Sequence, residues 1–106
     1  WFLAPYEWYN SAVSRWSDEM GMTLVNFTPG TGTSADYTTP DMKNYRSSDY
    51  LVERLASFAE KTPAGLNGAI ILIHPGTEPQ RTDKFWSRLD EIISYYTEKG
   101  YTFNRL

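Results

Sequence analysis

The chain has no cysteine and only one histidine, His74, among its 106 residues. The absence of cysteine excludes disulfide bonds, thiolate metal sites and a cysteine nucleophile. Long apolar segments are missing too. The longest uninterrupted aliphatic run extends from Ala69 to Ile73, far short of the roughly 20 apolar residues that a membrane-spanning helix needs. We therefore expect no membrane span.

An excess of positive charge is also lacking. The 10 Lys and Arg residues are outnumbered by 13 Asp and Glu residues, so the formal net charge is −3. Binding of nucleic acid without sequence preference needs a basic face, and we expect no nucleic-acid partner. With 41% hydrophobic residues and this length, the chain is typical of one globular domain.

Capping residues and helical spacing of apolar residues predict three helices. The first is expected over Ser11 to Met20, after the cap Asn10. The second is expected to begin at a cap among Ser47, Ser48 and Asp49, with its apolar residues between Leu51 and Ala59. The third is expected to begin at the cap Thr82 and to end at Gly100. Runs rich in β-branched and aromatic residues predict four strands. These are Trp1 to Ala4, Met22 to Phe27, the apolar run that ends before His74, and Tyr101 to Leu106.

Strict alternation of strand and helix predicts parallel βαβ units with right-handed crossovers. The expected fold class is therefore α/β, with the chain forming one part of a larger sheet or barrel. From Thr28 to Arg46 the sequence is rich in Gly, Thr, Ser, Asp and Pro and shows no period. We predict a structureless loop there, which in a compact domain is usually functional or disordered.

His74 is the first candidate for chemistry. It follows a buried apolar run and precedes the turn dipeptide Pro75-Gly76, so it is expected at the carboxyl end of a central parallel strand, facing a cleft. Histidine can give and take protons near neutral pH. The alternative is a histidine that only hydrogen-bonds a loop carbonyl. The Pro5-Tyr6 turn and the loop after Phe27 should share the same rim.

Aromatic residues make up 16% of the chain, and several gather at its start. Such rings either stack on sugar faces or fill a core, and core packing is the commoner use. Trp8 is expected to be packed. In the loop after His74, the residues Arg81, Thr82 and Asp83 are most simply a loop and a helix cap, with a substrate contact as the alternative.

Three segments resemble the polysaccharide deacetylases, which are metal-dependent carbohydrate esterases built on the NodB homology domain. Leu3-Ala4-Pro5-Tyr6 resembles the family's Arg-x-Pro-Tyr motif, Leu72-Ile73-His74 matches its Leu-x-His motif, and Lys99 to Phe103 resembles its usual ending. The resemblance implies that residues 1–106 are the C-terminal half of a domain that forms a distorted (β/α) barrel. It also implies a parent enzyme that hydrolyses N- or O-acetyl groups on a glycan.

The resemblance assigns roles to particular residues. His74 would be the general acid, Leu72 would line the acetyl pocket, and the backbone N–H of Tyr6, next to Pro5, would help to hold the oxyanion. Asp36-Tyr37 and Asp41 are the nearest counterparts of the family's Asp-Trp motif, and Asp36 and Tyr37 are further substrate-binding candidates. The family's metal, zinc or a similar divalent ion, is held by an Asp-His-His triad upstream of residue 1, so this chain alone should bind none.

The same resemblance implies an acetylated polysaccharide or oligosaccharide as partner, together with the missing N-terminal half of the domain, and a secreted or periplasmic protein. A homo-oligomer is also expected from exposed strand edges. Two alternatives remain open. Leu3 in place of the motif's arginine, with the aromatic cluster, allows a non-catalytic carbohydrate-binding barrel. A small open α/β domain for a phosphorylated ligand is weaker, because no phosphate-binding glycine motif is present.

Overall fold

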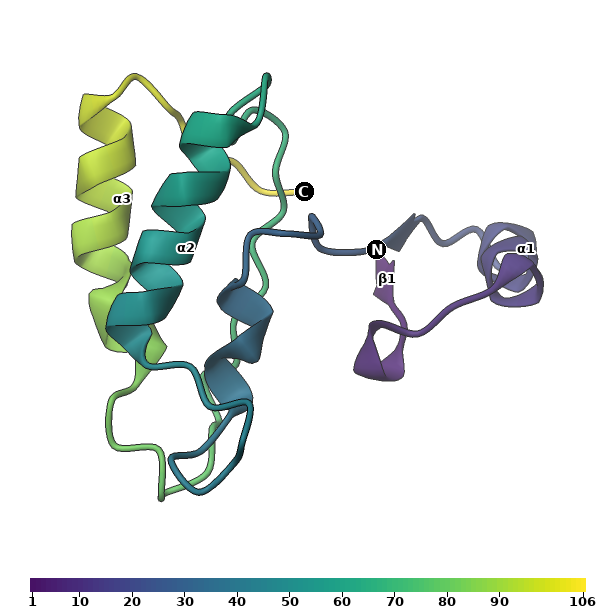
Figure 1. Cartoon of the computed structure of the whole chain (residues 1–106). Helices are drawn as coiled ribbons and strands as arrows, with labels where there is room; N and C mark the ends of the chain where they lie inside the picture. The colour runs from purple at the N-terminus through teal and green to yellow at the C-terminus, as the bar shows by residue number, and fades with distance from the viewer.

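The computed structural model describes all residues from 1 to 106, and its regular elements are mostly helical (Figure 1). Three α-helices, two strands of two residues each and three 3-10 turns follow one another along the chain. In chain order they are β1 (Phe2–Leu3), η1 (Pro5–Glu7), α1 (Ser11–Glu19), β2 (Leu24–Val25), η2 (Thr33–Tyr37), α2 (Ser48–Lys61), η3 (Phe85–Arg88) and α3 (Leu89–Glu98).

The three predicted helices are confirmed, and two of them begin at the expected caps. The side chain of Asn10 accepts hydrogen bonds from the backbone N–H groups of Ala12 and Val13, each at 3.0 Å. The hydroxyl of Ser47 accepts one from the N–H of Tyr50. These bonds satisfy N–H groups that have no partner inside a helix. The third helix begins later than expected, because the residues before Leu89 form η3.

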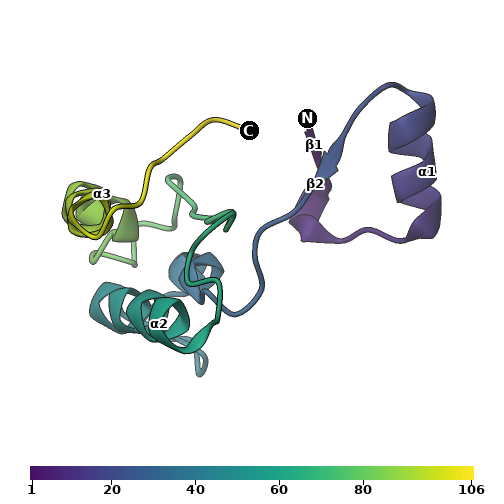
Figure 2. The same ribbon diagram turned by 90° about the horizontal axis from the view of Figure 1, so that it is seen from above.

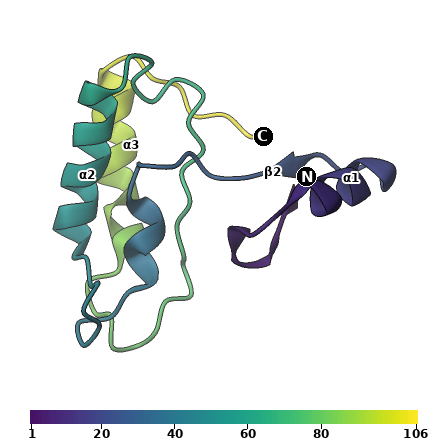
Figure 3. The same cartoon turned by 45° about the vertical axis from the view of Figure 1, so that its right-hand side comes forward.

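The core lies between α2 and α3, which run side by side in Figures 1 and 3. Its fully buried apolar residues are Leu51, Leu55, Phe85, Ile92 and Tyr96. The apolar stripes that predict helices α2 and α3 thus face each other, as expected for amphipathic helices.

The expected α/β fold, with parallel βαβ units forming the C-terminal part of a distorted (β/α) barrel, is wrong. The only strand pairing is β1 with β2, in parallel register with Phe2 opposite Leu24 and Leu3 opposite Val25. The segments 69–73 and 101–106 form no strand. His74 therefore does not lie at the end of a central parallel strand.

The apolar run before His74 is accommodated by helices instead of neighbouring strands. Ile71 and Ile73 pack against the helical core. Ile70 and Thr28 are joined by two hydrogen bonds, both 2.9 Å long. The N–H of Ile70 donates to Thr28 Oγ1, and the carbonyl of Ile70 accepts from the Thr28 N–H. At the end of the chain, the N–H of Tyr101 bonds to the carbonyl of Tyr96, which closes α3. No hydrogen-bond ladder forms around either segment.

The elements β1, η1, α1 and β2 form an N-terminal part that stands away from α2 and α3 (Figures 1 and 2). The radius of gyration is 15.3 Å, compared with about 13 Å for a compact domain of this length. No helix combines the length and the apolar character needed to cross a membrane, which confirms that part of the expectation.

The segment from Thr28 to Arg46 is not structureless as predicted. It contains η2, and it holds much of the buried polar surface of the molecule. Its buried polar residues are Thr31, Thr33, Asp36, Thr38 and Thr39. The hydroxyls of Thr31 and Thr38 bond to backbone carbonyls of the same segment, Asp36 bonds to His74, and only the Thr33 hydroxyl has no partner. This loop is therefore an organised part of the fold.

Candidate functional site

Asp36 and His74 form a pair joined by two hydrogen bonds. His74 Nδ1 lies 2.6 Å from Asp36 Oδ1, and the backbone N–H of His74 donates to Asp36 Oδ2 at 2.7 Å. Asp36 is only 1% exposed, whereas 35% of the His74 side chain is open to solvent. The carboxylate of the pair is therefore buried, while part of the imidazole is accessible to solvent.

The hydrogen bonds define which nitrogen of His74 carries the proton. An ionised carboxylate only accepts hydrogen bonds, so Nδ1 must be the donor in this pair. In the neutral ring, Nε2 is then the acceptor, and no protein group bonds to it. This arrangement leaves Nε2 free to exchange a proton with a bound molecule.

Asp36 is positioned by η2, which packs closely on α2. The turn begins after Gly32, whose φ of 83° lies in the left-handed region. A Cβ on Gly32 would lie 3.1 Å from Arg54 Cβ of α2. Glycine at this position therefore allows both the left-handed backbone and the close approach.

Tyr37 lies beside the pair. Its ring meets the imidazole of His74 edge to face, with centroids 5.8 Å apart and planes at 74°. Tyr37 is 48% exposed, whereas Asp36 is buried. Of the predicted site residues, the structure thus brings together His74, Asp36 and Tyr37.

A second polar cluster adjoins the pair and centres on Arg81, which is fully buried. Its Nη1 donates to the carbonyl of Thr38 at 2.7 Å and to that of Arg46 at 2.9 Å. Its Nη2 donates to Ser48 Oγ at 3.2 Å and lies 3.6 Å from Asp83 Oδ2. Arg81 therefore joins the loop after Asp36, the start of α2 and the loop after His74.

Asp83 is the partly exposed acidic member of this cluster. It accepts hydrogen bonds from the Ser48 N–H at 2.7 Å and the Tyr45 hydroxyl at 2.8 Å. Burial by itself would raise the pKa of Asp83, but these hydrogen bonds and the charge of Arg81 outweigh it, so the pKa lies below its usual value. Burial and the neighbouring Asp83 raise the pKa of Tyr45.

Arg81 and Asp83 were not identified from the sequence as residues that organise the site. Asp83 does cap a helix, but that helix is α2, 35 residues earlier in the chain, because its carboxylate bonds to the Ser48 N–H. An arginine and an aspartate in a polar loop look like any solvated pair. No local signal in the sequence marks Arg81 as buried or Asp83 as its partner.

Pro5 and Tyr6 lie in a different part of the molecule from His74. They belong to η1, and Tyr6 borders a separate hollow together with Trp8 and Asn26. The expectation that the Pro5-Tyr6 turn shares a rim with His74 depended on the predicted parallel sheet. Because that sheet does not form, this expectation is wrong too. Trp8 is 83% exposed, so the expectation that it is packed is also wrong.

The η1 backbone has an unusual conformation. Tyr6 and Glu7 have φ values of 55° and 58°, in the left-handed region that side chains other than glycine rarely adopt. The Asn26 side chain donates to the Glu7 carbonyl at 3.0 Å and helps to hold this turn. The Tyr6 side chain is 88% exposed.

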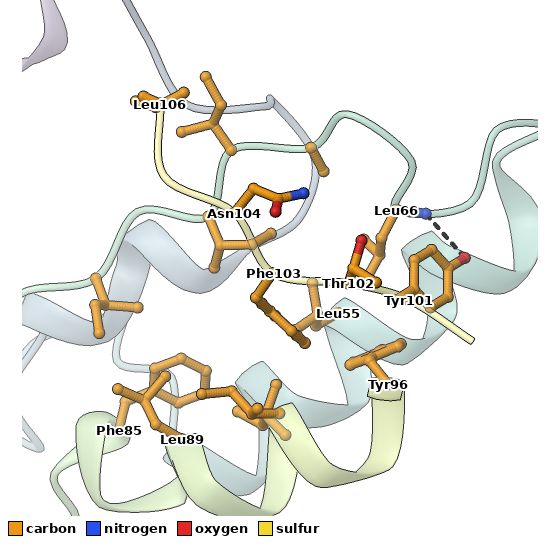
Figure 4. A pocket seen from close by; sticks show the side chains of 16 residues that line it. Leu55, Leu66, Phe85, Leu89, Tyr96, Tyr101, Thr102, Phe103, Asn104 and Leu106 are labelled. Atoms are coloured by element: carbon orange, nitrogen blue, oxygen red, sulfur yellow. Dashed lines mark hydrogen bonds between the residues drawn. The ribbon is translucent and has the colours of Figure 1, made fainter. Parts of the chain in front are cut away.

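Leu72 is half-buried. Its neighbours Ile71 and Ile73 line an apolar cavity of about 390 Å³ between α2, α3 and the C-terminal segment, but Leu72 does not (Figure 4). In the same cavity, the hydroxyl of Tyr101 accepts the N–H of Leu66 at 3.2 Å. No carboxylate, histidine or basic side chain lines the cavity, so it offers apolar contact and no acid or base.

The residues of this chain do not fit the divalent metal that the family resemblance implies. No three His, Asp or Glu side chains come together, and zinc sites of this kind need about three protein ligands. Both carboxylate oxygens of Asp36 are already bonded to His74. A metal would have to be held by residues outside this chain.

The chain matches no known protein family, no curated protein and no solved structure.

Proposed function

We propose that His74 is the general acid of a hydrolase that removes N- or O-acetyl groups from a glycan, and that this chain belongs to a longer, metal-dependent polysaccharide deacetylase. The observation that carries the proposal is the Asp36–His74 pair. A buried carboxylate holds Nδ1, the His74 side chain is 35% exposed, and no protein group bonds to Nε2. The resemblance of Leu72-Ile73-His74 to the Leu-x-His motif supports the substrate class.

The pair suits the breakdown of the tetrahedral intermediate in acyl transfer. Protonated His74 donates its Nε2 proton to the leaving nitrogen or oxygen of the glycan as the bond from that atom to the acetyl carbon breaks. The carboxylate of Asp36 stabilises the imidazolium before this step and keeps the ring in the correct orientation. Asp36 therefore acts through His74, and Tyr37 and Leu72 are left as candidates for substrate contact.

In the longer parent protein, His74→Ala should reduce acetate release from an acetylated oligosaccharide by about 10² to 10⁴-fold, the usual contribution of a general acid. Asp36→Asn should also reduce it, because the amide cannot balance the imidazolium charge. Metal content should remain unchanged in both variants. Asp41→Asn is a matched control, since Asp41 lies in the same loop and its side chain accepts a hydrogen bond from Thr39 and none from His74. Unaltered turnover in His74→Ala, or loss of metal, would contradict the acid role.

Carbohydrate binding without catalysis is a second candidate, and the exposed aromatic residues of the N-terminal part favour it. Tyr6 and Trp8 are 88% and 83% exposed, and they border a hollow together with Glu7 and Asn26. Aromatic faces with nearby polar groups are suited to stacking on sugars. The acetate assay separates the two functions: a parent that binds the oligosaccharide but releases no acetate would favour binding alone.

A further inference from the structure

Arg81 connects the two segments that carry the Asp36–His74 pair. It lies in the loop that follows His74, and its Nη1 donates to the carbonyl of Thr38, two residues after Asp36. The same Nη1 donates to the carbonyl of Arg46, at the far end of the long loop. One guanidinium group therefore fixes both ends of the loop after Asp36 to the loop after His74.

We propose that Arg81 is a positioning residue that sets the geometry of the Asp36–His74 pair by clamping these two segments together. The inference concerns the pair itself and does not depend on which reaction the pair serves. It differs from the proposed function because Arg81 is fully buried and makes no hydrogen bond to the imidazole.

The burial of Arg81 restricts the position of its guanidinium group. The side chain is 0% exposed, and its Nε–H has no hydrogen-bond partner. A buried donor without a partner is unfavourable, so the position of the guanidinium is determined by the groups that Nη1 and Nη2 reach. Arg81 Cζ also lies 5.4 Å from the centre of the Tyr45 ring, which is close enough for a favourable contact with the cation.

Lysine could not replace this group. The guanidinium is a rigid planar fork, and here one nitrogen bonds to two loop carbonyls while the other bonds to Ser48 Oγ. An ammonium group concentrates its donors at one point on a flexible stem. Arg81→Lys would keep the charge opposite Asp83 and lose the simultaneous connection to the loop and to α2.

The single histidine makes the test direct, because every imidazole signal in an NMR spectrum of this chain belongs to His74. Two protons report on the pair: the ring Nδ1–H, bonded to Asp36 Oδ1, and the backbone N–H of His74, bonded to Asp36 Oδ2. In wild type we expect a downfield Nδ1–H signal and a protected backbone amide. Asp36→Asn is the reference for a broken pair.

Arg81→Lys should weaken the Nδ1–H signal and speed amide exchange at His74 by about tenfold or more, while the amide of Leu55 in the core changes little. Comparing His74 with Leu55 separates loss of positioning from general loss of stability. Arg88→Lys is the matched control, since Arg88 pairs only with Asp49 and Glu91 on the surface, and both His74 signals should stay as in wild type.

Ser48→Ala is a milder variant that keeps the test decisive if Arg81→Lys fails to fold. It removes the hydroxyl that accepts from Arg81 Nη2 and donates to the Asp83 carbonyl. We expect a smaller change at His74 in the same direction. The proposal would be overturned if a folded Arg81→Lys protein kept the wild-type Nδ1–H signal and the wild-type amide exchange at His74. If Arg81→Lys does not fold, the same result in Ser48→Ala would overturn it.

Discussion

The fold stabilises the ionised form of Asp83. The Ser48 N–H, the Tyr45 hydroxyl and the Arg81 guanidinium all favour its ionised form, although burial opposes it. A carboxylate that accepts such bonds is harder to protonate in the folded chain than in the unfolded chain. Protonation of Asp83 is therefore coupled to unfolding.

This coupling predicts how stability depends on pH. The folded pKa of Asp83 is lowered, whereas the unfolded value is about 3.9. Asp83 therefore stabilises the fold fully above its unfolded pKa, and the contribution is lost as the pH falls through the folded pKa. Urea unfolding should show a gap between wild type and Asp83→Asn near neutral pH that narrows below about pH 4.

Glu91→Gln is a useful comparison for this experiment. A hydrogen bond from Arg88 lowers the pKa of Glu91 as well, but the pair lies on the surface, where ion pairs contribute little. We expect a smaller gap for Glu91→Gln at neutral pH. A gap for Asp83→Asn that stays constant from neutral to acid pH would show that its hydrogen bonds do not depend on its charge.

At the residue scale, the sequence identifies part of the site. His74 is recognised because it is the only histidine and follows an apolar run, and Asp36 and Tyr37 are recognised through a weak motif match. The role of Arg81 could not be found in this way. Burial of a charged residue depends on partners brought together by the fold, here the carbonyls of Thr38 and Arg46, 43 and 35 residues away.

At the scale of elements, the turn after α2 shows how two glycines with similar backbones can have different roles. Gly65 and Gly68 have φ values of 58° and 73°. A Cβ on Gly65 would collide with the hydroxyl of Tyr101, while a Cβ on Gly68 would meet nothing within 4 Å. Only Gly65 lies beneath the C-terminal segment.

Gly68→Ala should cost about 1–2 kcal/mol of unfolding free energy, the penalty for a left-handed residue with a side chain. Gly65→Ala should cost about 1 kcal/mol more, because the Tyr101 hydroxyl must move away from the Leu66 N–H. Chemical denaturation of the two variants measures the difference. Equal losses of stability would mean that the Tyr101 contact contributes nothing to holding the C-terminal segment.

The helices and strands differ in how far local sequence determines them. Helices α1 and α2 are specified by their own residues: the caps Asn10 and Ser47 supply partners for the first turn, and apolar spacing fixes the buried face. A strand also needs a neighbour. A short apolar run is compatible with a buried strand or with another buried segment, and Ile71 and Ile73 pack on helices instead.

At the scale of the whole molecule, the chain exposes more surface than a compact monomer of its size. Its accessible surface is 7541 Å², compared with about 6,000 Å² expected for a monomer of this mass. The excess is larger than the roughly 800 Å² that each partner buries in a typical protein interface. Only 14 of 106 residues are buried, and Trp8 and Trp16 in the N-terminal part are more than half exposed. An interface would cover this surface.

We therefore expect the isolated chain to self-associate, with the N-terminal part in the contact. Light scattering between about 1 and 100 μM should show a mass that rises with concentration, as for any assembly governed by mass action. Replacing both Trp8 and Trp16 with serine should lower the mass toward the monomer, since it removes apolar surface from the exposed part. Trp86→Ser is the matched control, because Trp86 is also exposed, at 47%, but lies on η3 beside the helical core. A monomer at every concentration would show that the extended shape is stable without a partner, and equal effects of the serine variants would place the contact elsewhere.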